Sequence, residues 1–274
     1  MNSLEGKTIL VTGATDGVGK QSALELAQMG AKVILHGRSL ERARQTKKEI
    51  EQATGNHQLD IVLADYCSLK QVKAMAEEIN AKFSHLDVLL NNTGVYLKDR
   101  FVTEDGFEMT FQVNYLSVFL LTNLLLGLLK KSSPARIVTV ASTAHMGSGL
   151  DFNDLQMEKD FDGEKAYRLS KLACICMSYE LAERLKNSGV TSNSLHPGAV
   201  DTKMLRFAHE DMQGINIQDG AATSVYLASS PDVEGVTGLF YDEKKPIKSK
   251  ELSYDPATCK KFWEIGEKLL EKYL

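Results

Sequence analysis

The chain has 274 residues, of which 43% are hydrophobic and 25% charged, a composition that supports a folded core and excludes a disordered or collagen-like chain. Lysine and arginine total 32, while aspartate and glutamate total 36, so the formal net charge is −4 and no basic excess exists to bind nucleic acid. Four scattered cysteines, none in a Cys-x-x-Cys pair, predict a reducing compartment rather than a disulfide framework.

The N-terminal segment, residues 1–7, has neither an apolar signal core nor an arginine-rich amphipathic presequence. The most apolar stretch, residues 115–129, is too short to span a bilayer and is interrupted by polar residues and a glycine. We therefore expect a soluble, cytoplasmic protein without a membrane partner.

Short apolar segments alternate with helical patterns along the chain. The predicted strands are 8–11, 32–35, 59–63, 88–90, 136–140, 190–196 and 239–241. The predicted helices are 18–29, 39–52, 69–83, 104–130, 165–187 and 219–228. This alternation indicates βαβ units, so we predict a single α/β domain over residues 1–274. Its core, at about 6–241, is expected to be a doubly wound parallel sheet of order 3-2-1-4-5-6-7 with helices on both faces.

Residues 242–274 read as a charged tail that ends in an amphipathic helix. We expect this helix to pack its apolar side chains on the core, and a membrane-surface role is the alternative. None of the six histidines pairs with another ligand type at i, i+4, so no metal site is expected.

A glycine-rich segment, Thr-Gly-Ala-Thr-Asp-Gly-Val-Gly at residues 12–19, joins the first predicted strand to the first predicted helix. Gly13 allows the tight turn, Gly17 lets backbone amides approach a pyrophosphate, and Gly19 lets the helix lie close to the strand. The alternative is a glycine-rich turn without a ligand. The residues expected to hold a dinucleotide here are Gly13, Thr15, Asp16, Gly17, Val18 and Gly19.

The T-G-x-x-x-G-x-G spacing resembles that of the short-chain dehydrogenase/reductase family. Four further matches follow in the order expected of that family. They are Asn91-Asn92-Thr93-Gly94 for its N-N-A-G, Asn114 in a helix, Ser142 with Tyr167-x-x-x-Lys171, and Pro197-Gly198 with Thr202. The resemblance covers about residues 6–241, departs from the usual pattern at Thr93, and is strongest with the retinol-dehydrogenase-like branch over residues 91–202.

The resemblance implies a catalytic set. Tyr167 would exchange a proton with the substrate oxygen, and Lys171, one helical turn away, would favour the phenolate and hold ribose hydroxyls. Ser142 would hydrogen-bond the substrate carbonyl, and Asn114 would support a water behind the lysine. Taken singly, the four residues could instead be an interface tyrosine, a solvated lysine, a strand-end hydroxyl and a polar helix contact.

The segment after the second predicted strand, Leu35-His-Gly-Arg-Ser39, lacks the carboxylate that NAD-preferring relatives place there. Arg38 could hold the 2′-phosphate of NADP(H), and Ser39 could add a hydroxyl or cap the next helix. We therefore predict NADP(H), the alternative being a solvated Arg38 and a purely capping Ser39. Further cofactor contacts implied by the resemblance are Asp65, Asn92, Gly94, Tyr167, Lys171, Pro197, Gly198, Val200 and Thr202. For Asp65 the alternative is an Asx turn.

Apolar residues in segments 143–164 and 202–217, together with Val95 and Tyr96, suggest a small apolar aldehyde, ketone or alcohol as substrate. The alternative is that these side chains anchor their loops to the core. His145 could line this pocket or lie in a surface loop. The favoured function is an NADP(H)-dependent carbonyl reductase or alcohol dehydrogenase. The alternatives are a C=C reductase similar to protochlorophyllide reductases and a non-catalytic NADP(H)-binding redox sensor.

The predicted helix 104–130 is apolar nearly all round, so something besides its own sheet should cover one face. In the resembling family this helix and the one carrying the tyrosine often pair with their symmetry mates. We therefore expect a homodimer, with burial under the C-terminal tail as the alternative.

Overall fold

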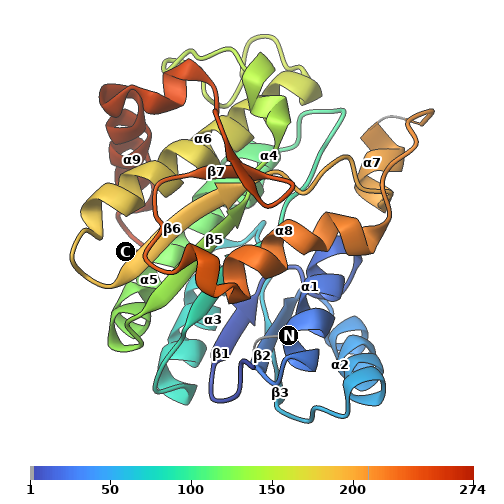
Figure 1. Cartoon of the computed structure of the whole chain (residues 1–274). Coiled ribbons are helices and arrows are strands. Elements are labelled where there is room, and N and C mark those ends of the chain that lie inside the picture. Colours follow the sequence, from blue (N-terminus) through green and yellow to red (C-terminus); the bar gives the residue numbers. More distant parts are fainter. Residues whose placement is uncertain (1–2, 209) are drawn as a thin grey trace.

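The computed structural model describes residues 3–208 and 210–274 (Figure 1). Residues 1 and 2, part of the N-terminal segment expected to lack a leader, and residue 209, within the apolar segment 202–217, lie outside the described chain. Eight strands form one sheet of order β3-β2-β1-β4-β5-β6-β7-β8. They are β1 (Thr8–Val11), β2 (Lys32–Gly37), β3 (Leu59–Leu63), β4 (Val88–Asn91), β5 (Ala135–Val140), β6 (Val190–Leu195), β7 (Phe240–Asp242) and β8 (Lys245–Ile247). The predicted order of the first seven is confirmed.

The first seven strands run parallel, and β8 pairs antiparallel with β7. Parallel strands are covered on both faces, which explains why β1 is buried throughout its length and apolar after Thr8. The strand order reverses between β1 and β4, where Val11 pairs with Leu90. Ligands of doubly wound sheets bind at the carboxyl ends of the strands beside this reversal, so the architecture itself indicates where a site should lie.

Helices cover both faces of the sheet (Figure 1). They are α1 (Gly17–Gln28), α2 (Leu40–Thr54), α3 (Leu69–Lys82), α4 (Met109–Phe111), α5 (Ser117–Lys131), α6 (Gly163–Arg184), α7 (Lys203–Ala208), α8 (Ile217–Ser229) and α9 (Pro256–Leu270). Side chains of α3, α5, α6 and α9 share one apolar core with the sheet, and side chains of α1, α2 and α8 share a second on the opposite face.

The helix expected from residue 104 begins later, at Met109. Residues 102–108 form a turn instead, closed by a bridge between Val102 and Glu108. The Glu108 carboxylate then caps the helix by accepting hydrogen bonds from the N–H groups of Thr110 and Phe111, at 2.8 and 2.7 Å. The late start has a local cause, because a buried carboxylate capping the first turn sets the point at which the helix begins.

The helical stretch Met109–Lys131 is, within the described chain, long and apolar enough to cross a membrane, which corrects the estimate that residues 115–129 are too short. Most of the stretch is buried inside the fold. Phe119, Leu121 and Leu125, for example, have no exposed surface. The stretch therefore has the surroundings of a core helix.

The C-terminal tail is part of the packed structure rather than an appendage to a core that ends at residue 241. Its first part adds β8 to the sheet edge, and α9 packs its apolar residues against α5 and α6. Phe262 has no exposed surface, its carbonyl accepts a hydrogen bond from the Tyr115 hydroxyl at 2.7 Å, and the Trp263 ring lies 4.6 Å from that of Phe119. The expected apolar contact of the terminal helix is confirmed. Part of the apolar surface on which the homodimer was argued, around Phe119, is thus covered by α9, which is the alternative considered for this helix, and the homodimer stays a prediction.

Candidate functional site

Most of the residues singled out from the sequence gather at the carboxyl edge of the sheet. The glycine loop follows β1, Arg38 follows β2, Asn92 follows β4, and Ser142 follows β5. Parallel strands bring these ends together whatever their distance in sequence. Helix α6 then passes this edge and carries Tyr167 and Lys171.

The glycine loop has the backbone that its sequence requires. Gly13 and Gly17 adopt positive φ angles of +65° and +51°, which other residues rarely tolerate. At Gly19, a Cβ atom would lie 2.3 Å from the carbonyl oxygen of Gly13 and from Nδ2 of Asn92. The loop, α1 and the end of β4 therefore approach each other as closely as backbone allows. This leaves the N-terminus of α1 facing the site.

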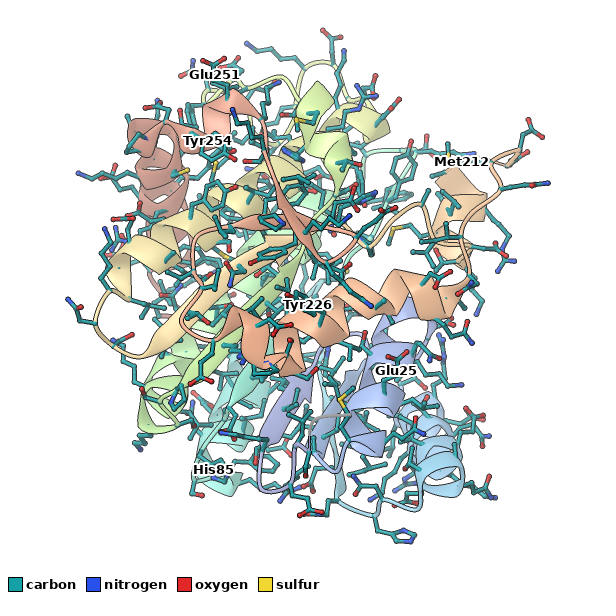
Figure 2. The ribbon with its side chains drawn as sticks, viewed as in Figure 1. Glu25, His85, Met212, Tyr226, Glu251 and Tyr254 are labelled. Carbon is teal, nitrogen blue, oxygen red and sulfur yellow. The ribbon has the colours of Figure 1, made fainter. Side chains whose placement is uncertain are left out.

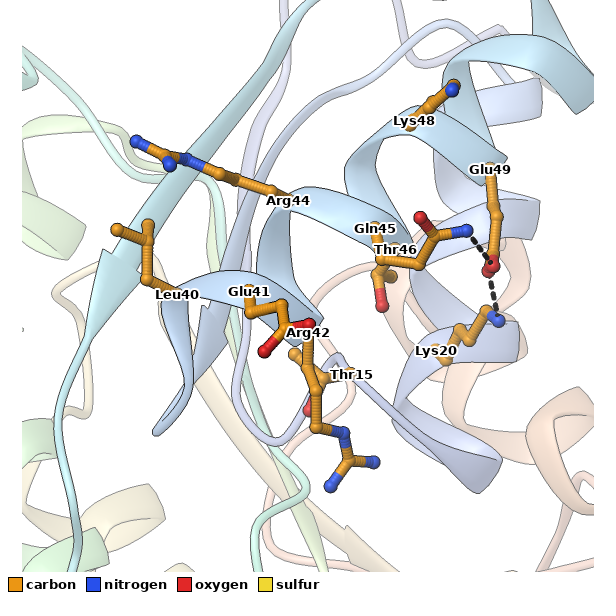
Figure 3. A pocket seen from close by; sticks show the side chains of 10 residues that line it. All are labelled: Thr15, Lys20, Leu40, Glu41, Arg42, Arg44, Gln45, Thr46, Lys48 and Glu49. Carbon is orange, nitrogen blue, oxygen red and sulfur yellow. Dashed lines mark hydrogen bonds and ion pairs between the residues drawn. The ribbon is translucent and has the colours of Figure 1, made fainter.

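Asp16 caps α1 by accepting a hydrogen bond from the N–H of Gly17 at 2.9 Å. Its carboxylate also forms ion pairs with Arg42 of α2, at 3.0 Å, and Lys203 of α7, at 2.8 Å. The glycine loop is thereby tied to two elements that flank the site. A surface groove lies beside the glycine loop. It is lined by Thr15 of the loop, by Lys20 of α1 and by residues of α2 that include Arg42 (Figure 3).

His36, in β2, is a residue of the site that the sequence analysis considered only as a metal ligand. Its Nδ1 accepts a hydrogen bond from the N–H of Gly13, and its Nε2 donates to the carbonyl of Ala64, each at 3.1 Å. Burial lowers the pKa of His36 to about 4, because the imidazolium would lose its hydration there. A neutral imidazole therefore joins the glycine loop to the end of β3. The sequence signal that could have identified His36 is its place in the predicted strand next to the one that leads into the glycine loop.

Arg38 is exposed directly after β2 and forms no ion pair within residues 3–208 and 210–274. Ser39 accepts a hydrogen bond from the N–H of Arg42 at 3.4 Å and caps α2, and Asp65 accepts one from the N–H of Cys67 at 2.9 Å in an Asx turn. The capping role considered for Ser39 and the Asx turn considered for Asp65 are thus both present in the structure. Cofactor contacts by Arg38, Ser39 and Asp65 stay predictions.

The segment after β4 is bonded to the glycine loop and to α6. Asn92 donates from Nδ2 to the carbonyl of Thr12 at 2.9 Å, so its side chain holds the loop. At Gly94, a Cβ atom would lie 3.3 Å from Nζ of Lys171 and 3.4 Å from Oδ1 of Asn114. Glycine at this position therefore lets the backbone pass close to the lysine.

Ser142, Tyr167 and Lys171 lie around the end of β5. Ser142 is buried, and its hydroxyl accepts a hydrogen bond from the N–H of Ala144 at 3.2 Å. Lys171 is also buried. Its ammonium group donates a hydrogen bond to the carbonyl of Val140 at 3.1 Å and lies 5.4 Å from the ring centroid of Tyr167. The ammonium group is therefore held between the strand that carries the serine and the tyrosine ring.

Asn114 lies in a π-helical turn, η1 (Gln112–Leu116), that joins α4 to α5. Such turns are frequent at functional sites because they redirect backbone and side-chain groups. Its amide accepts a hydrogen bond from the N–H of Val95 at 2.7 Å and donates to the hydroxyl of Ser170 at 2.9 Å. The main-chain carbonyl of Asn114 accepts one from the thiol of Cys174. Asn114 thus fixes the segment after β4 against α6, close to Lys171.

The segment after β6 returns toward the glycine loop. Gly198 has a φ of +90°, and Val200 pairs with Ile215 in an isolated bridge. A Cβ atom on Gly17 would lie 3.3 Å from Cγ2 of Thr202. The region from Pro197 to Thr202 therefore approaches the glycine loop at Thr202.

The residues suggested as substrate walls divide into two groups. Tyr96 lies with its ring centroid 5.6 Å from that of Tyr167 and 6.4 Å from that of Phe207, which is half exposed. Leu150 and Phe152 instead pack on the core, with Phe152 5.0 Å from Phe262 of α9. For this second group the loop-anchoring alternative is the correct one. His145 has no exposed surface and so lines no pocket.

Comparisons with known proteins agree on one family. A family model described as short chain dehydrogenase matches residues 7–213. Retinol dehydrogenase 14 of Mus musculus is 41% identical over 96% of this chain and 86% of its own, and retinol dehydrogenase 13 of Homo sapiens is 37% identical over 98% and 86%. A short chain dehydrogenase from Escherichia coli CFT073 complexed with NADPH has a TM-score of 0.72 and 28% identity, over 89% of this chain and 99% of that one. A protein from Mycobacterium paratuberculosis gives 0.83 and 28%, over 99% and 96%.

Proposed function

This chain belongs to the short-chain dehydrogenase family and is an NAD(P)-dependent oxidoreductase, and from that premise we propose that it uses NADP(H) on a small apolar carbonyl or alcohol. The observation that carries the proposal is the placement of Ser142, Tyr167 and Lys171 beside the glycine loop at one edge of the sheet. Ser142 and Tyr167 would act on one oxygen atom of the substrate, and Lys171 would act on it through Tyr167.

The residues of the site fit a dinucleotide. Gly13 and Gly17 have the positive φ angles that a phosphate loop needs, and the N-terminus of α1 offers backbone N–H groups and the positive end of its dipole. Lys171 would hold ribose hydroxyls. When bound, the nicotinamide supplies hydride to a carbonyl carbon or takes it from an alcohol carbon.

The chain's own residues would handle the proton and the oxygen. The hydroxyl of Ser142 would donate a hydrogen bond to the carbonyl oxygen and hold it within reach of Tyr167. The Tyr167 hydroxyl would give its proton to that oxygen as the alcohol forms, and Lys171 would stabilise the phenolate left behind. Oxidation of an alcohol is the reverse, with the phenolate taking the proton.

The aromatic ring of Tyr96 beside Tyr167, and the apolar side chains of the segment that contacts it, support an apolar substrate. The Tyr96 ring contacts the rings of both Tyr167 and Phe207, and the apolar Met212 and Ile215, close to half exposed, follow α7 along the chain. Figure 2 shows Met212 at the edge of the molecule, in the segment beyond α7. A panel of apolar aldehydes, ketones, alcohols and C=C substrates, read at the nicotinamide absorbance, tests the proposal. Turnover of C=C bonds alone would favour the second enzyme class, and no turnover with tight NADPH binding would favour a sensor.

Arg38→Ala should weaken NADP(H) binding by about 10- to 100-fold and leave NAD(H) binding almost unchanged, because only NADP(H) carries the 2′-phosphate. Arg38 is exposed at the end of β2 and free of ion pairs within the described residues, so its guanidinium can receive that phosphate. Titration of both cofactors against wild type and variant measures the effect.

Lys48→Ala is the matched control, because Lys48 is an exposed cation of α2 whose side chain lies far along the helix from Thr15 (Figure 3). It should change neither affinity by more than about twofold, in keeping with a screened surface charge. Equal losses for NADP(H) and NAD(H) in the Arg38 variant, or a wild type that prefers NAD(H), would contradict the assignment.

Location and assembly stay predictions. We propose that the enzyme is cytoplasmic and has no membrane partner. Fractionation of cells that express the protein tests this location. A homodimer would have to form through a surface other than the α9-covered face of α5. Light scattering at micromolar concentration measures it: the mass of one 30.3 kDa chain would contradict the dimer.

A further inference from the structure

His145 occupies the short 3-10 helix η2 (Thr143–Gly147) that follows Ser142, and it is completely buried. Its Nδ1 lies 2.5 Å from the carbonyl oxygen of Ser142. Its Nε2 lies 3.0 Å from the backbone nitrogen of Lys250. A backbone N–H can only donate a hydrogen bond, so Nε2 is the acceptor. The two partners fix the ring as neutral, with Nδ1–H donating to Ser142 and Nε2 accepting from Lys250.

Lys250 contacts the same loop at two further points. Its ammonium group donates to the carbonyl oxygens of Met146, at 3.1 Å, and Ser148, at 2.5 Å. Lys250 lies between β8 and the 3-10 helix η4 (Glu251–Tyr254), the segment where Figure 2 labels Glu251 and Tyr254. A residue of the C-terminal segment thus binds the loop after Ser142 through its backbone and its side chain.

The remaining contacts hold the imidazole and the serine in fixed orientations. The His145 ring meets the ring of Phe240 in β7 edge-on, with centroids 5.0 Å apart. Ser142 is extended, with φ −167° and ψ 148°, and its hydroxyl accepts the N–H of Ala144. A rotation of the loop that begins at Ser142 would therefore move the carbonyl and the hydroxyl of this residue together, so contacts that hold the carbonyl also hold the hydroxyl.

We propose that His145 and the backbone N–H of Lys250 position Ser142 for hydrogen bonding to the substrate oxygen. The contact makes the C-terminal segment, which holds His145 through the backbone N–H of Lys250, a determinant of turnover. His145 is a positioning residue, because it acts through Ser142. This inference rests on the proposed function, since it requires Ser142 to bind the substrate oxygen.

A double-mutant cycle between His145 and Ser142 tests the proposal. His145→Phe keeps a planar ring and removes both hydrogen bonds, so it should lower kcat by about 10- to 100-fold, the range expected when a catalytic group is displaced by up to an ångström. The Kd for NADPH should stay within about twofold, because the hydrogen bonds of His145 go to Ser142 and Lys250, neither of which is a predicted cofactor contact. In a Ser142→Ala background the same substitution should change kcat by less than about twofold, since the group it positions is gone.

Two substitutions at Lys250 isolate the backbone hydrogen bond without altering His145. The φ of Lys250 is −59°, which suits proline. Lys250→Ala removes the ammonium and keeps the N–H, whereas Lys250→Pro removes both. In the presence of Ser142, the proline variant should therefore have a kcat at least about fivefold below that of the alanine variant. In a Ser142→Ala background the two should have the same kcat. His145→Asn, whose amide can still donate to Ser142, should recover part of the kcat lost in His145→Phe.

NADPH binding and thermal unfolding establish that each variant is folded before kcat is compared. If His145→Phe fails to fold, the Lys250 pair carries the test. Equal loss of kcat in both Ser142 backgrounds, or equal kcat for Lys250→Pro and Lys250→Ala, would overturn the positioning role. Wild-type turnover in Ser142→Ala alone would instead overturn the proposed function, so the two failures are distinguishable.

Discussion

Tyr167→Phe should lower turnover by about 10²- to 10⁴-fold, the loss typical when a general acid–base group is removed. The substitution deletes one hydroxyl and keeps the ring that packs beside Tyr96 and Lys171. Folding and NADPH affinity should therefore persist. Single-turnover rates with a substrate found in the panel, together with an NADPH titration, measure the effect.

Tyr96→Phe is the matched control, because it removes a hydroxyl from the neighbouring ring, 5.6 Å away by centroids. Tyr96 has no part in the proposed proton transfer, so its variant should keep kcat within a few-fold of wild type, although KM can change with the pocket wall. A Tyr167→Phe enzyme that retains most of its turnover would show that the proton comes from another group.

The free energy of unfolding should fall by about 2 kcal/mol between pH 7.5 and pH 5 because of His36 alone, and by about 3 kcal/mol by pH 4. Burial lowers the pKa of His36 from 6.5 to about 4 in the folded chain. Between these values the unfolded chain binds the additional proton, so protonation favours unfolding. The contribution of His36 is therefore fully present above about pH 6.5 and is lost as the pH falls toward 4. Urea unfolding at a series of pH values measures it.

His36→Asn provides the comparison, because the asparagine amide cannot be protonated in this range and its oxygen can still accept the N–H of Gly13. Other histidines, such as the buried His145 and the partly buried His196, titrate equally in both proteins and cancel in the difference. The stability difference between wild type and variant should shrink by about 2 kcal/mol from pH 7.5 to pH 5. A difference that is constant with pH would contradict the neutral, loop-holding role of His36.

Local patterns in the sequence were sufficient to predict the first seven strands of the sheet and to propose most of the candidate site residues. Alternating apolar segments and helices predict parallel βαβ units, because each strand of such a sheet is buried and each crossover needs a helix. Gly13 and Gly17 indicate the phosphate loop because the turn requires positive φ, a property of single residues. The four-residue spacing of Tyr167 and Lys171 places both on one face of α6 for the same local reason.

Features that depend on contacts between distant segments were decided only by the tertiary structure. The composition of α9 shows an apolar face but does not say what covers it, and Phe262 and Trp263 meet Tyr115 and Phe119 more than 140 residues earlier in the chain. The hydrogen bonds of His36 to Gly13 and Ala64, and of His145 to Ser142 and Lys250, likewise depend on how separate segments pack. Side-chain periodicity reports which face of an element is apolar, because it reflects burial. The identity of a partner depends on how the elements pack, which a single sequence does not display.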